Sequence, residues 1–334
     1  MSTNTTNLPN LLAACAQAAY FAGNEVRQVV ESNEDLQIVD KKSNDNTSAT
    51  ININTNNTIL DPQTIADRKA QQVILTLLRK NFPNVSYVAE EEEESIENEE
   101  LFADNEINMN HIPKSYFEGL DLDEQEENSN KISIWIDPMD GTQMFLSKRY
   151  EECSVLIGVA VNKRPVLGII HLPFTHESYV GYYTPTFSLF LHGNYKSDTV
   201  TWKTHTLQNS TSNEIRIITS PKPSPKRDQL LQSFHPQEIK LHYSNAVGTM
   251  ILRVLKHEAD VYLRCREGAM RWDFCACDAL LLAAGGRLVD CYGDVYSYDV
   301  ESDSYKNMHG AIATLNISLL EKFLNRMSAL NQSI

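Results

Sequence analysis

One segment limits the possible folds of this chain more than any other: a continuous apolar run that ends in acidic and turn-forming residues. The run is Ile132 to Ile136, and the next six residues, Asp137 to Thr142, read Asp-Pro-Met-Asp-Gly-Thr. A short apolar run bounded by turn residues is typical of a strand that is buried on both faces. The chain must therefore build a covered sheet around this strand, with the carboxylates of Asp137 and Asp140 at its carboxyl end.

Pro138 and Gly141 favour a tight turn directly after this strand. In such a turn the carboxylates of Asp137 and Asp140 and the carbonyl oxygen of Met139 point to one side. Oxygen ligands at this density suit Mg²⁺ or Mn²⁺ rather than Zn²⁺, which prefers nitrogen and sulfur. A polar β-turn without a ligand fits the same residues equally well, so the segment alone leaves both interpretations open.

Other carboxylates lie where a site could form. Glu90 follows a short predicted strand, Val85 to Val88, whereas Glu92 to Glu94 are typical of a solvated charge run. Asp273 opens a predicted helix, and Asp67 lies in a capping-box position. Helix capping explains Asp273 and Asp67 without any metal, so both interpretations stay open for them.

Helical and strand periodicities divide the chain into two halves. The first half combines amphipathic helices with strands joined by short turns, which predicts an α+β arrangement with an antiparallel sheet. The second half alternates strands and helices, which predicts an α/β arrangement. We therefore expect two domains, residues 1–183 and 184–334. The predicted helices lie at 11–29, from 64 to near 83, and from 226, 245 and 273, and the predicted strands lie at 85–88, 132–136, 154–161, 166–171, 177–183, 214–219, 259–264 and 286–290.

Two segments are predicted to be loops. Ser43 to Thr58 is rich in Asn, Thr and Ser, and Glu90 to Asn130 is acidic with few apolar residues. The acidic segment contains sixteen Asp and Glu residues against one lysine, which equals the whole formal net charge of -15. The rest of the chain is formally neutral, so no basic surface for nucleic acid is predicted.

Cysteine usage and the N-terminal residues indicate the compartment. The six cysteines contain no CxxC pair and are expected to be reduced thiols. The apolar stretch from Leu11 to Ala22 is too short and too polar, with Gln17 inside it, to span a membrane, and no basic segment precedes it. We therefore expect a cytoplasmic protein without membrane or nucleic-acid partners, either a monomer or a homodimer.

The motifs occur in an order that resembles a known family. Ala89-Glu90-Glu91, then Asp137 to Thr142, then WDFCACDALLLAAGG at 272–286 resemble the signature of the inositol monophosphatase-like superfamily of lithium-sensitive, Mg²⁺-dependent phosphatases. Within it, DPQTIADRKAQ at 61–71 and KNMHGAIATL at 306–315 are most similar to the 3'(2'),5'-bisphosphate nucleotidases. The DGT form of the turn favours this branch over inositol polyphosphate 1-phosphatases, which carry a DST form. The resemblance covers residues 60 to 315.

The resemblance implies a layered αβαβα sandwich with two or three Mg²⁺ ions per site. Mn²⁺ would substitute for Mg²⁺, and lithium and sodium would inhibit. The implied metal ligands are Glu90, Asp137, the Met139 carbonyl, Asp140 and Asp273, and the implied catalytic residues beside the attacking water are Asp67 and Thr142. Two positions depart from the family pattern: Ala89 replaces the usual glycine, and the segment 43–58 is longer than the corresponding loop.

Candidate substrate contacts come from turns and from the resemblance. The amide groups of Gly141 and Thr142 could bind phosphate oxygens, as could the predicted helix start at Gly248 and Thr249, for which an ordinary capped helix is the alternative. By resemblance, Ser220, Glu267 and Arg271 surround the organic part of the substrate, and Arg271 could bind a second phosphate.

The resemblance implies hydrolysis of a small phosphorylated metabolite by a metal-activated water. The expected substrate is 3'-phosphoadenosine 5'-phosphate, released as AMP and phosphate, with the 5'-phosphosulfate analogue as a second substrate and a role in sulfur assimilation. The nearest alternative is an inositol polyphosphate 1-phosphatase acting on inositol 1,4-bisphosphate. A catalytically inactive nucleotide or metal sensor, and a module that docks a partner through its acidic segment, are alternatives of other classes.

Overall fold

The computed structural model describes residues 4–41, 61–91, 106–120, 125–196, 199–204 and 214–332. The Asn-rich segment 43–58 lies outside these residues, so its prediction as a loop stays a prediction. Of the acidic segment 90–130, only residues 90–91, 106–120 and 125–130 are described.

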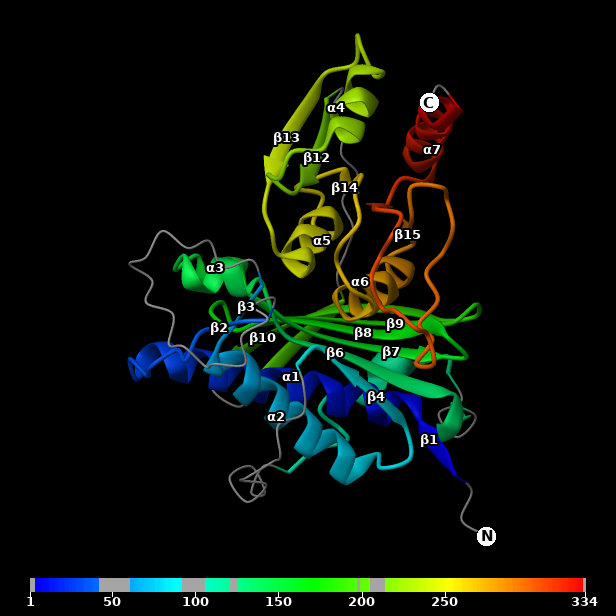
Figure 1. The fold of residues 1–334 in the computed structure, drawn as a ribbon. Coiled ribbons are helices and arrows are strands. Elements are labelled where there is room, and N and C mark those ends of the chain that lie inside the picture. Colours follow the sequence, from blue (N-terminus) through cyan, green and yellow to red (C-terminus); the bar gives the residue numbers. More distant parts are fainter. Residues whose placement is uncertain are drawn as a thin grey trace.

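The described chain stacks helices and sheets in five layers (Figure 1). Helices α1 (Leu8–Glu31) and α2 (Ile65–Asn81) cover one face of a seven-stranded sheet. Helices α5 (Val247–Leu255) and α6 (Arg271–Ala283) lie between this sheet and a five-stranded sheet. Helices α4 (Pro225–Gln232) and α7 (Ile317–Gln332) cover the far face of the second sheet. The layers are those of the αβαβα sandwich that the resemblance implied, so this prediction is confirmed.

The seven-stranded sheet is antiparallel except at one edge. Its order is β11-β10-β9-β8-β7-β6-β4, and β4 runs parallel to β6. The strands are β4 (Ser86–Ala89), β6 (Ile132–Asp140), β7 (Ser154–Val161), β8 (Arg164–Leu172), β9 (Glu177–Tyr183), β10 (Ser188–Lys196) and β11 (Thr199–Thr204). Because β10 pairs with β9, the sheet continues past residue 183, where we placed the domain boundary. Strands β10 and β11 form the edge of the first sheet, and the first strand of the second sheet along the chain is β12, after Thr204.

The five-stranded sheet belongs to the second half of the chain. Its order is β13-β12-β14-β16-β15, with β12 parallel to both of its neighbours. The strands are β12 (Ile215–Thr219), β13 (Ile239–Tyr243), β14 (Val261–Arg264), β15 (Arg287–Val289) and β16 (Ala311–Thr314). The expected α/β alternation is present, but β13, β16 and α7 were not predicted.

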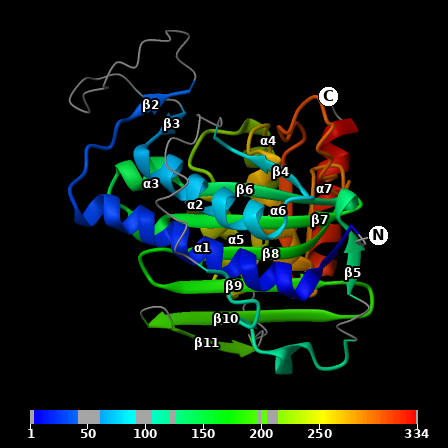
Figure 2. The same ribbon diagram turned by 90° about the horizontal axis from the view of Figure 1, so that it is seen from below.

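Capping and apolar stripes explain the two helices of the outer layer. The side chain of Asn7 accepts from the Asn10 amide at the start of α1, and Thr64 and Asp67 form the predicted capping box at the start of α2. Buried residues from Leu11 to Val29 in α1 pack against those of α2 and the sheet. Figure 2 shows both helices lying over the strands of the seven-stranded sheet. This layer holds Asp67 close to the end of β6.

Two glycines let α6 lie directly on the seven-stranded sheet. A β-carbon added at Gly158 of β7 would lie 2.4 Å from the Ala276 backbone nitrogen, and one added at Gly168 of β8 would lie 2.3 Å from the Ala276 carbonyl oxygen. Any side chain at either position would push the helix away. The contact therefore sets the height of α6 above the sheet, and with it the position of Asp273.

Short elements complete the described fold. They are β1 (Thr5–Asn7), β2 (Val39–Asp40), β3 (Pro62–Gln63), β5 (Glu126–Asn128), α3 (Thr142–Leu146) and the 3₁₀ helices η2 (Lys114–Phe117), η3 (Ser129–Lys131) and η4 (Tyr150–Glu152). The acidic segment was expected to be a long loop with one helical turn at most. The 3₁₀ helix η2 is such a turn, whereas β5, which pairs with β1, was not expected.

The cysteines and the helices bear on the expected compartment. All six cysteines are buried free thiols, as the sequence predicted. Among the described helices, none has the length and apolar character needed to cross a bilayer. The cytoplasmic location and the monomeric or dimeric state stay predictions.

Candidate active site

A β-bulge brings the two aspartates of β6 together. Asp137 pairs with Leu156 and Asp140 pairs with Ser154, so β6 has one more residue than β7 between these two pairs. In a regular strand, residues three apart point to opposite faces, and the extra residue reverses this parity. Pro138 lies in the bulge, where a residue without an amide hydrogen is tolerated. The bulge thus directs both carboxylates to the same crevice.

Asp140 is fixed by three hydrogen bonds. Its Oδ1 accepts from the Val247 amide at 3.0 Å, and its Oδ2 accepts from the Gly248 amide at 2.7 Å and from Ser154 Oγ at 3.1 Å. These donors belong to the first turn of α5 and to β7. The amides at this helix start, which we predicted to bind substrate phosphate through Gly248, therefore hold a carboxylate of the protein.

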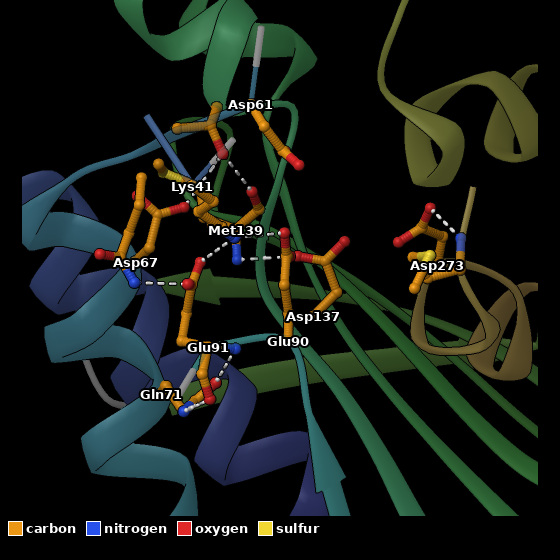
Figure 3. A network of polar contacts seen from close by, with 12 residues as sticks. Lys41, Asp61, Asp67, Gln71, Glu90, Glu91, Asp137, Met139 and Asp273 are labelled. Carbon is orange, nitrogen blue, oxygen red and sulfur yellow. Dashed lines mark hydrogen bonds and ion pairs between the residues drawn. The ribbon is translucent and has the colours of Figure 1, made fainter. Parts of the chain in front are cut away.

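Glu90 and Glu91 have different surroundings (Figure 3). The Glu90 amide donates to the Ile136 carbonyl at 3.0 Å, which places Glu90 beside the end of β6. Its side chain lines the pocket, and Lys41 Nζ lies 2.8 Å from its Oε1. Glu91 is 4% exposed, contacts Lys41 at 2.8 Å, accepts from the Gln63 side chain and exchanges hydrogen bonds with Gln71. The residue that faces the site is therefore Glu90.

Asp273 reaches the site from α6. Its Oδ2 accepts from the Met270 amide at 2.9 Å, which is the helix-capping role considered from the sequence. The same side chain lines the pocket with Glu90 and Asp140. Capping orients the carboxylate without removing it from the pocket, so the two interpretations of Asp273 are compatible.

Asp67 and Thr142 meet across 75 residues of sequence. Thr142 Oγ1 lies 3.0 Å from Asp67 Oδ1 and 3.3 Å from the Met139 carbonyl oxygen. Asp67 is fully buried, and its other carboxylate oxygen accepts from the amide and the hydroxyl of Thr64, both at 2.6 Å. Gly141 precedes Thr142 with a φ of 93°, a conformation that glycine adopts without strain. The turn therefore points the threonine hydroxyl at the aspartate.

The carboxyls of the site repel one another. Desolvation, with repulsion from Glu90, Asp140 and Asp273, raises the pKa of Asp137 well above its ordinary value. Desolvation raises the pKa of Asp140 to about 7, and desolvation with repulsion from Glu90 and Asp140 raises that of Asp273 to about 8. Each shift means that the protein leaves negative charge at the site uncompensated.

The donor set fits a hard cation. Every candidate ligand is an oxygen, which suits Mg²⁺ or Mn²⁺, and the uncompensated charge favours a divalent ion. Within the part of the chain that the structure describes, no three acidic, histidine or cysteine side chains converge closely enough to hold an ion as they lie. The Lys41 ammonium lies 2.8 Å from Oε1 of Glu90 and of Glu91 and provides positive charge there.

The pocket contains part of the predicted set of substrate contacts. Gly141 and Thr142 line it, together with Glu90, Asp140 and Asp273. The other predicted contacts, which are Ser220, Gly248, Thr249, Glu267 and Arg271, do not line it.

The structure gives these residues other contacts. The Ser220 hydroxyl lies 3.1 Å from Oδ1 of Asn245, a residue that lines the pocket. The Thr249 hydroxyl lies 3.3 Å from the Ala246 carbonyl oxygen. Glu267 forms an ion pair with Lys306 at 3.0 Å. The Arg271 guanidinium lies over the Tyr296 ring, 4.6 Å from its centre. The structure therefore places Arg271 against an aromatic ring and outside the pocket lining, and its expected role at a second phosphate stays a prediction.

Several residues that line the pocket were not predicted from the sequence. They are Asp61, Pro62, Gln143, Lys222, Asn245, Val247, Arg264, Arg266 and Ala269. Arg264 and Arg266 had a usable signal, because they stand at the carboxyl end of a predicted strand, as Glu90 and Asp137 do. Lys222 is brought in by a loop and had none, whereas Asn245 and Val247 belong to the predicted helix start at 244–249 that was considered for ligand binding.

The fold and the site define a class: a layered α/β protein with a crevice of clustered carboxylates suited to hard cations. The comparisons with known proteins make this specific, because the model of the inositol monophosphatase family matches residues 8–325. The chain belongs to the inositol monophosphatase family and is a phosphatase of that family. The match extends beyond the residues 60–315 that carried the resemblance.

Relatives in several organisms agree with this assignment. A 3'(2'),5'-bisphosphate nucleotidase 1 of Homo sapiens is 27% identical over 94% of this chain and 94% of its own length. A protein described as putative inositol monophosphatase 3 of Drosophila melanogaster is 27% identical over 92% of this chain and 78% of its own. The solved structure of CysQ from Bacteroides thetaiotaomicron, a bacterial member of the inositol monophosphatase family, has a TM-score of 0.62 at 20% identity, covering 92% of this chain and 97% of that chain. The structural likeness establishes the fold.

Proposed function

We propose that this phosphatase is a Mg²⁺-dependent phosphomonoesterase that hydrolyses 3'-phosphoadenosine 5'-phosphate to AMP and phosphate. The 5'-phosphosulfate analogue is proposed as a second substrate of the same site. The observation that carries the proposal is the convergence of Glu90, Asp140, Thr142 and Asp273 on one pocket, with Asp137 on the same strand as Asp140 and Asp67 hydrogen-bonded to Thr142. The bisphosphate nucleotidase relatives support the nucleotide as substrate.

The proposed metal ligands are Glu90, Asp137, the Met139 carbonyl, Asp140 and Asp273, holding two or three ions. Bound Mg²⁺ supplies an acidified water and offsets the charge of the phosphate. The chain's own residues then orient this water. When the Thr142 hydroxyl donates to Asp67 Oδ1, its oxygen can accept a hydrogen bond from the water.

Asp67 is the proposed proton acceptor. Desolvation raises its pKa to about 6, so at neutral pH the carboxylate is mostly ionised and can take up a proton. The amides of Gly141 and Thr142, at the wall of the pocket, are the proposed donors to the phosphate oxygens. These roles require no covalent intermediate on the protein.

An inositol phosphate is the second candidate substrate. The matching family model carries the inositol monophosphatase description, and the two Drosophila relatives are described as putative inositol monophosphatases. The carboxylate cluster would serve both substrates, because it acts on the phosphate rather than on the organic group. A catalytically inactive sensor is disfavoured, because such a protein has no need of the complete acidic set.

The test is phosphate release with Mg²⁺ from 3'-phosphoadenosine 5'-phosphate and from inositol 1,4-bisphosphate, with and without lithium. We expect faster release from the nucleotide and inhibition by lithium. A preference for the inositol compound would assign the chain to the second candidate with the same site. Release from neither compound would contradict the proposal.

A further inference from the structure

Two cysteines meet at one end of the five-stranded sheet. Cys265 directly follows β14 and Cys291 comes shortly after β15, and these two strands flank β16 in the sheet. Cys291 Sγ lies 3.5 Å from the carbonyl oxygen of Arg264, whose peptide group leads into Cys265. Both cysteine side chains are buried in the same apolar cluster. The fold therefore makes neighbours of two thiols that belong to different strands.

Gly310 allows this contact across the sheet. It directly precedes β16, between the two cysteines, and its φ is 73°. A β-carbon added at Gly310 would lie 2.7 Å from Cys291 Sγ and 2.3 Å from the Arg264 carbonyl oxygen. Because a side chain at this position would meet both groups, the glycine is what lets the chain on either side of β16 come together.

The two thiols are linked by a hydrogen bond and differ in acidity. This hydrogen bond, together with burial, raises the pKa of Cys265. The same hydrogen bond, with the Lys226 ammonium and the Ala311 amide, lowers the pKa of Cys291 against the opposing effects of burial and of Asp290. A lowered pKa provides more thiolate, which is the nucleophilic form of cysteine. Cys291 is therefore the reactive member of the pair, and Cys265 is the thiol beside it.

The other four cysteines have different surroundings. Cys15, Cys275 and Cys277 have no exposed surface and Cys153 is 1% exposed, whereas Cys265 is 8% exposed. Burial raises the pKa of each of these four thiols. Such cysteines behave as small apolar side chains and react slowly.

The cysteine pair is adjacent to the pocket in the chain. Arg264 and Arg266, the two neighbours of Cys265, both line the pocket. In a disulfide the two sulfurs lie about 2 Å apart, which is closer than any hydrogen bond allows. Forming it would shift the backbone at Cys265 and remove the contact of the Cys291 thiol with the Arg264 carbonyl. The side chains of Arg264 and Arg266 would then move relative to the carboxylates of the pocket.

We propose that Cys265 and Cys291 form a redox-sensitive modification site, in which hydrogen peroxide oxidises the two thiols to a disulfide and thereby lowers phosphatase activity at the pocket. The Cys291 thiolate attacks one oxygen of the peroxide and the O–O bond breaks. The departing hydroxide takes up the proton that the thiol had lost and becomes water. Cys265 then attacks the sulfenic acid on Cys291, and its proton leaves with the hydroxyl group as a second water. Two thiols and one peroxide thus give one disulfide and two waters, and a thiol reductant reverses the change.

The experiment oxidises the full chain in the presence of Mg²⁺. Reduced protein is treated with hydrogen peroxide, alkylated and digested for mass spectrometry, and phosphate release is measured in parallel before and after dithiothreitol. We expect a linked Cys265–Cys291 peptide as the main disulfide product and a fall in kcat/KM of about fivefold or more, the size of a modest coupling between two sites. Dithiothreitol should reverse both effects.

Three variants separate this site from general oxidation. Cys291→Ser should form no disulfide and keep its activity under peroxide. Cys265→Ser should leave Cys291 as a sulfenic or sulfinic acid, because no second thiol is present to form the disulfide. Cys15→Ala removes a buried thiol of α1 and should respond to peroxide as the unaltered protein does. Urea unfolding of each reduced variant checks that the fold is retained.

The outcomes distinguish this inference from the proposed function. Absence of the linked peptide, or earlier oxidation of another cysteine, would overturn the site. A linked peptide with unchanged turnover, or an equal loss of turnover in Cys291→Ser, would overturn its control of the pocket. Failure of the reduced chain to release phosphate from any compound would contradict the proposed function alone, because the mass of the linked peptide decides the redox site without reference to a substrate.

Discussion

At the scale of single residues, hydrogen bonds determine which way each carboxylate of the site points. Asp140 is the clearest case, because two backbone amides and a hydroxyl leave its oxygens only one arrangement. Asp67 is held similarly by Thr64, and Asp273 by the Met270 amide. Hydrogen bonds within the protein therefore orient these three carboxylates, although no three such side chains of the described residues lie close enough together to hold an ion as they stand.

Asp140→Asn tests this positioning. An asparagine amide nitrogen would face the Val247 or Gly248 amide, donor against donor, and one buried polar group would lose its partner. We expect a loss of stability of about 1–3 kcal/mol with the fold retained, and Mg²⁺-dependent turnover below about 1% of the unaltered rate, since losing one electrostatic contact to the reacting centre can cost a hundredfold or more. Circular dichroism and phosphate release measure the two effects. Normal turnover would contradict the role of Asp140 in the site.

The two glutamates after β4 allow a matched comparison. Glu90 lines the pocket, whereas Glu91 is buried among Gln63, Gln71 and Lys41. Glu90→Gln should abolish Mg²⁺-dependent turnover, because it removes an anionic ligand facing the site. Glu91→Gln should retain most of the turnover and lose stability, by about 1.5–3 kcal/mol for a hydrogen bond to a charged group. Equal loss of turnover in both would show that the buried glutamate also serves the site.

The sequence predicted the acidic residues of the site but not the arginines that line the same pocket. Asp137 and Asp140 were predicted because an apolar strand ends directly before them. The β-bulge that brings their side chains to the same face was not predicted from the sequence. Asp67 and Thr142 lie 75 residues apart, so only the resemblance connected them. Arg264 and Arg266 also lie at the carboxyl end of a predicted strand, a signal that could have been used and was not.

At the scale of elements, the contact of α6 with β7 and β8 determines where Asp273 lies. Gly158→Ala should push α6 from the sheet, since the new methyl group would meet the Ala276 nitrogen at 2.4 Å. We expect a loss of about 1–3 kcal/mol in the free energy of unfolding and reduced turnover through displacement of Asp273. Urea unfolding and phosphate release measure both. As a control, Gly119→Ala adds a methyl group at a glycine with no atom within 4 Å, so any loss there would reflect its φ of 92° alone.

Element prediction succeeded where periodicity was long or capped. Helices α1 and α2 have sustained apolar stripes and recognisable caps, and both were predicted. Strand β16 has only four residues, all buried, which is too short for a period to be counted. Helix α7 was not predicted, although Leu320, Phe323 and Met327 have helical spacing. These three side chains of α7 are buried in one cluster.

At the scale of the whole molecule, buried histidines make stability depend on pH. His171 is fully buried, and desolvation lowers its pKa to about 3. Because the folded pKa lies below the unfolded value of about 6.5, the folded state disfavours the proton. The resulting stability is complete above pH 6.5 and is lost as the pH falls from 6.5 towards 3.

We therefore expect the free energy of unfolding to fall between pH 6.5 and pH 5 by about 2 kcal/mol from His171 alone. His171→Asn should flatten this part of the profile while lowering stability at neutral pH. Urea unfolding at several pH values measures both. A profile that is unchanged in the variant would rule out His171 as the source of the slope.

The layered arrangement was predictable from the resemblance, whereas the limit of the first sheet was not. Strands β7, β8 and β9 are almost continuously buried, whereas β10 and β11 carry more exposed polar residues, so the change of pattern near residue 183 marks the edge of the sheet and not its end. The boundary depends on which strands pair, and pairing is a property of the folded chain.

The residues of the site are scattered along the chain at 67, 90, 137–142 and 273, and they meet only where both sheets and α6 have come together. Contacts between such distant residues form slowly, because the entropy of closing long loops opposes them. An isolated half of the chain would hold only some of the carboxylates. During refolding, phosphatase activity should therefore return more slowly than the circular-dichroism signal of the helices. Activity then indicates that the long-range contacts of the site have formed.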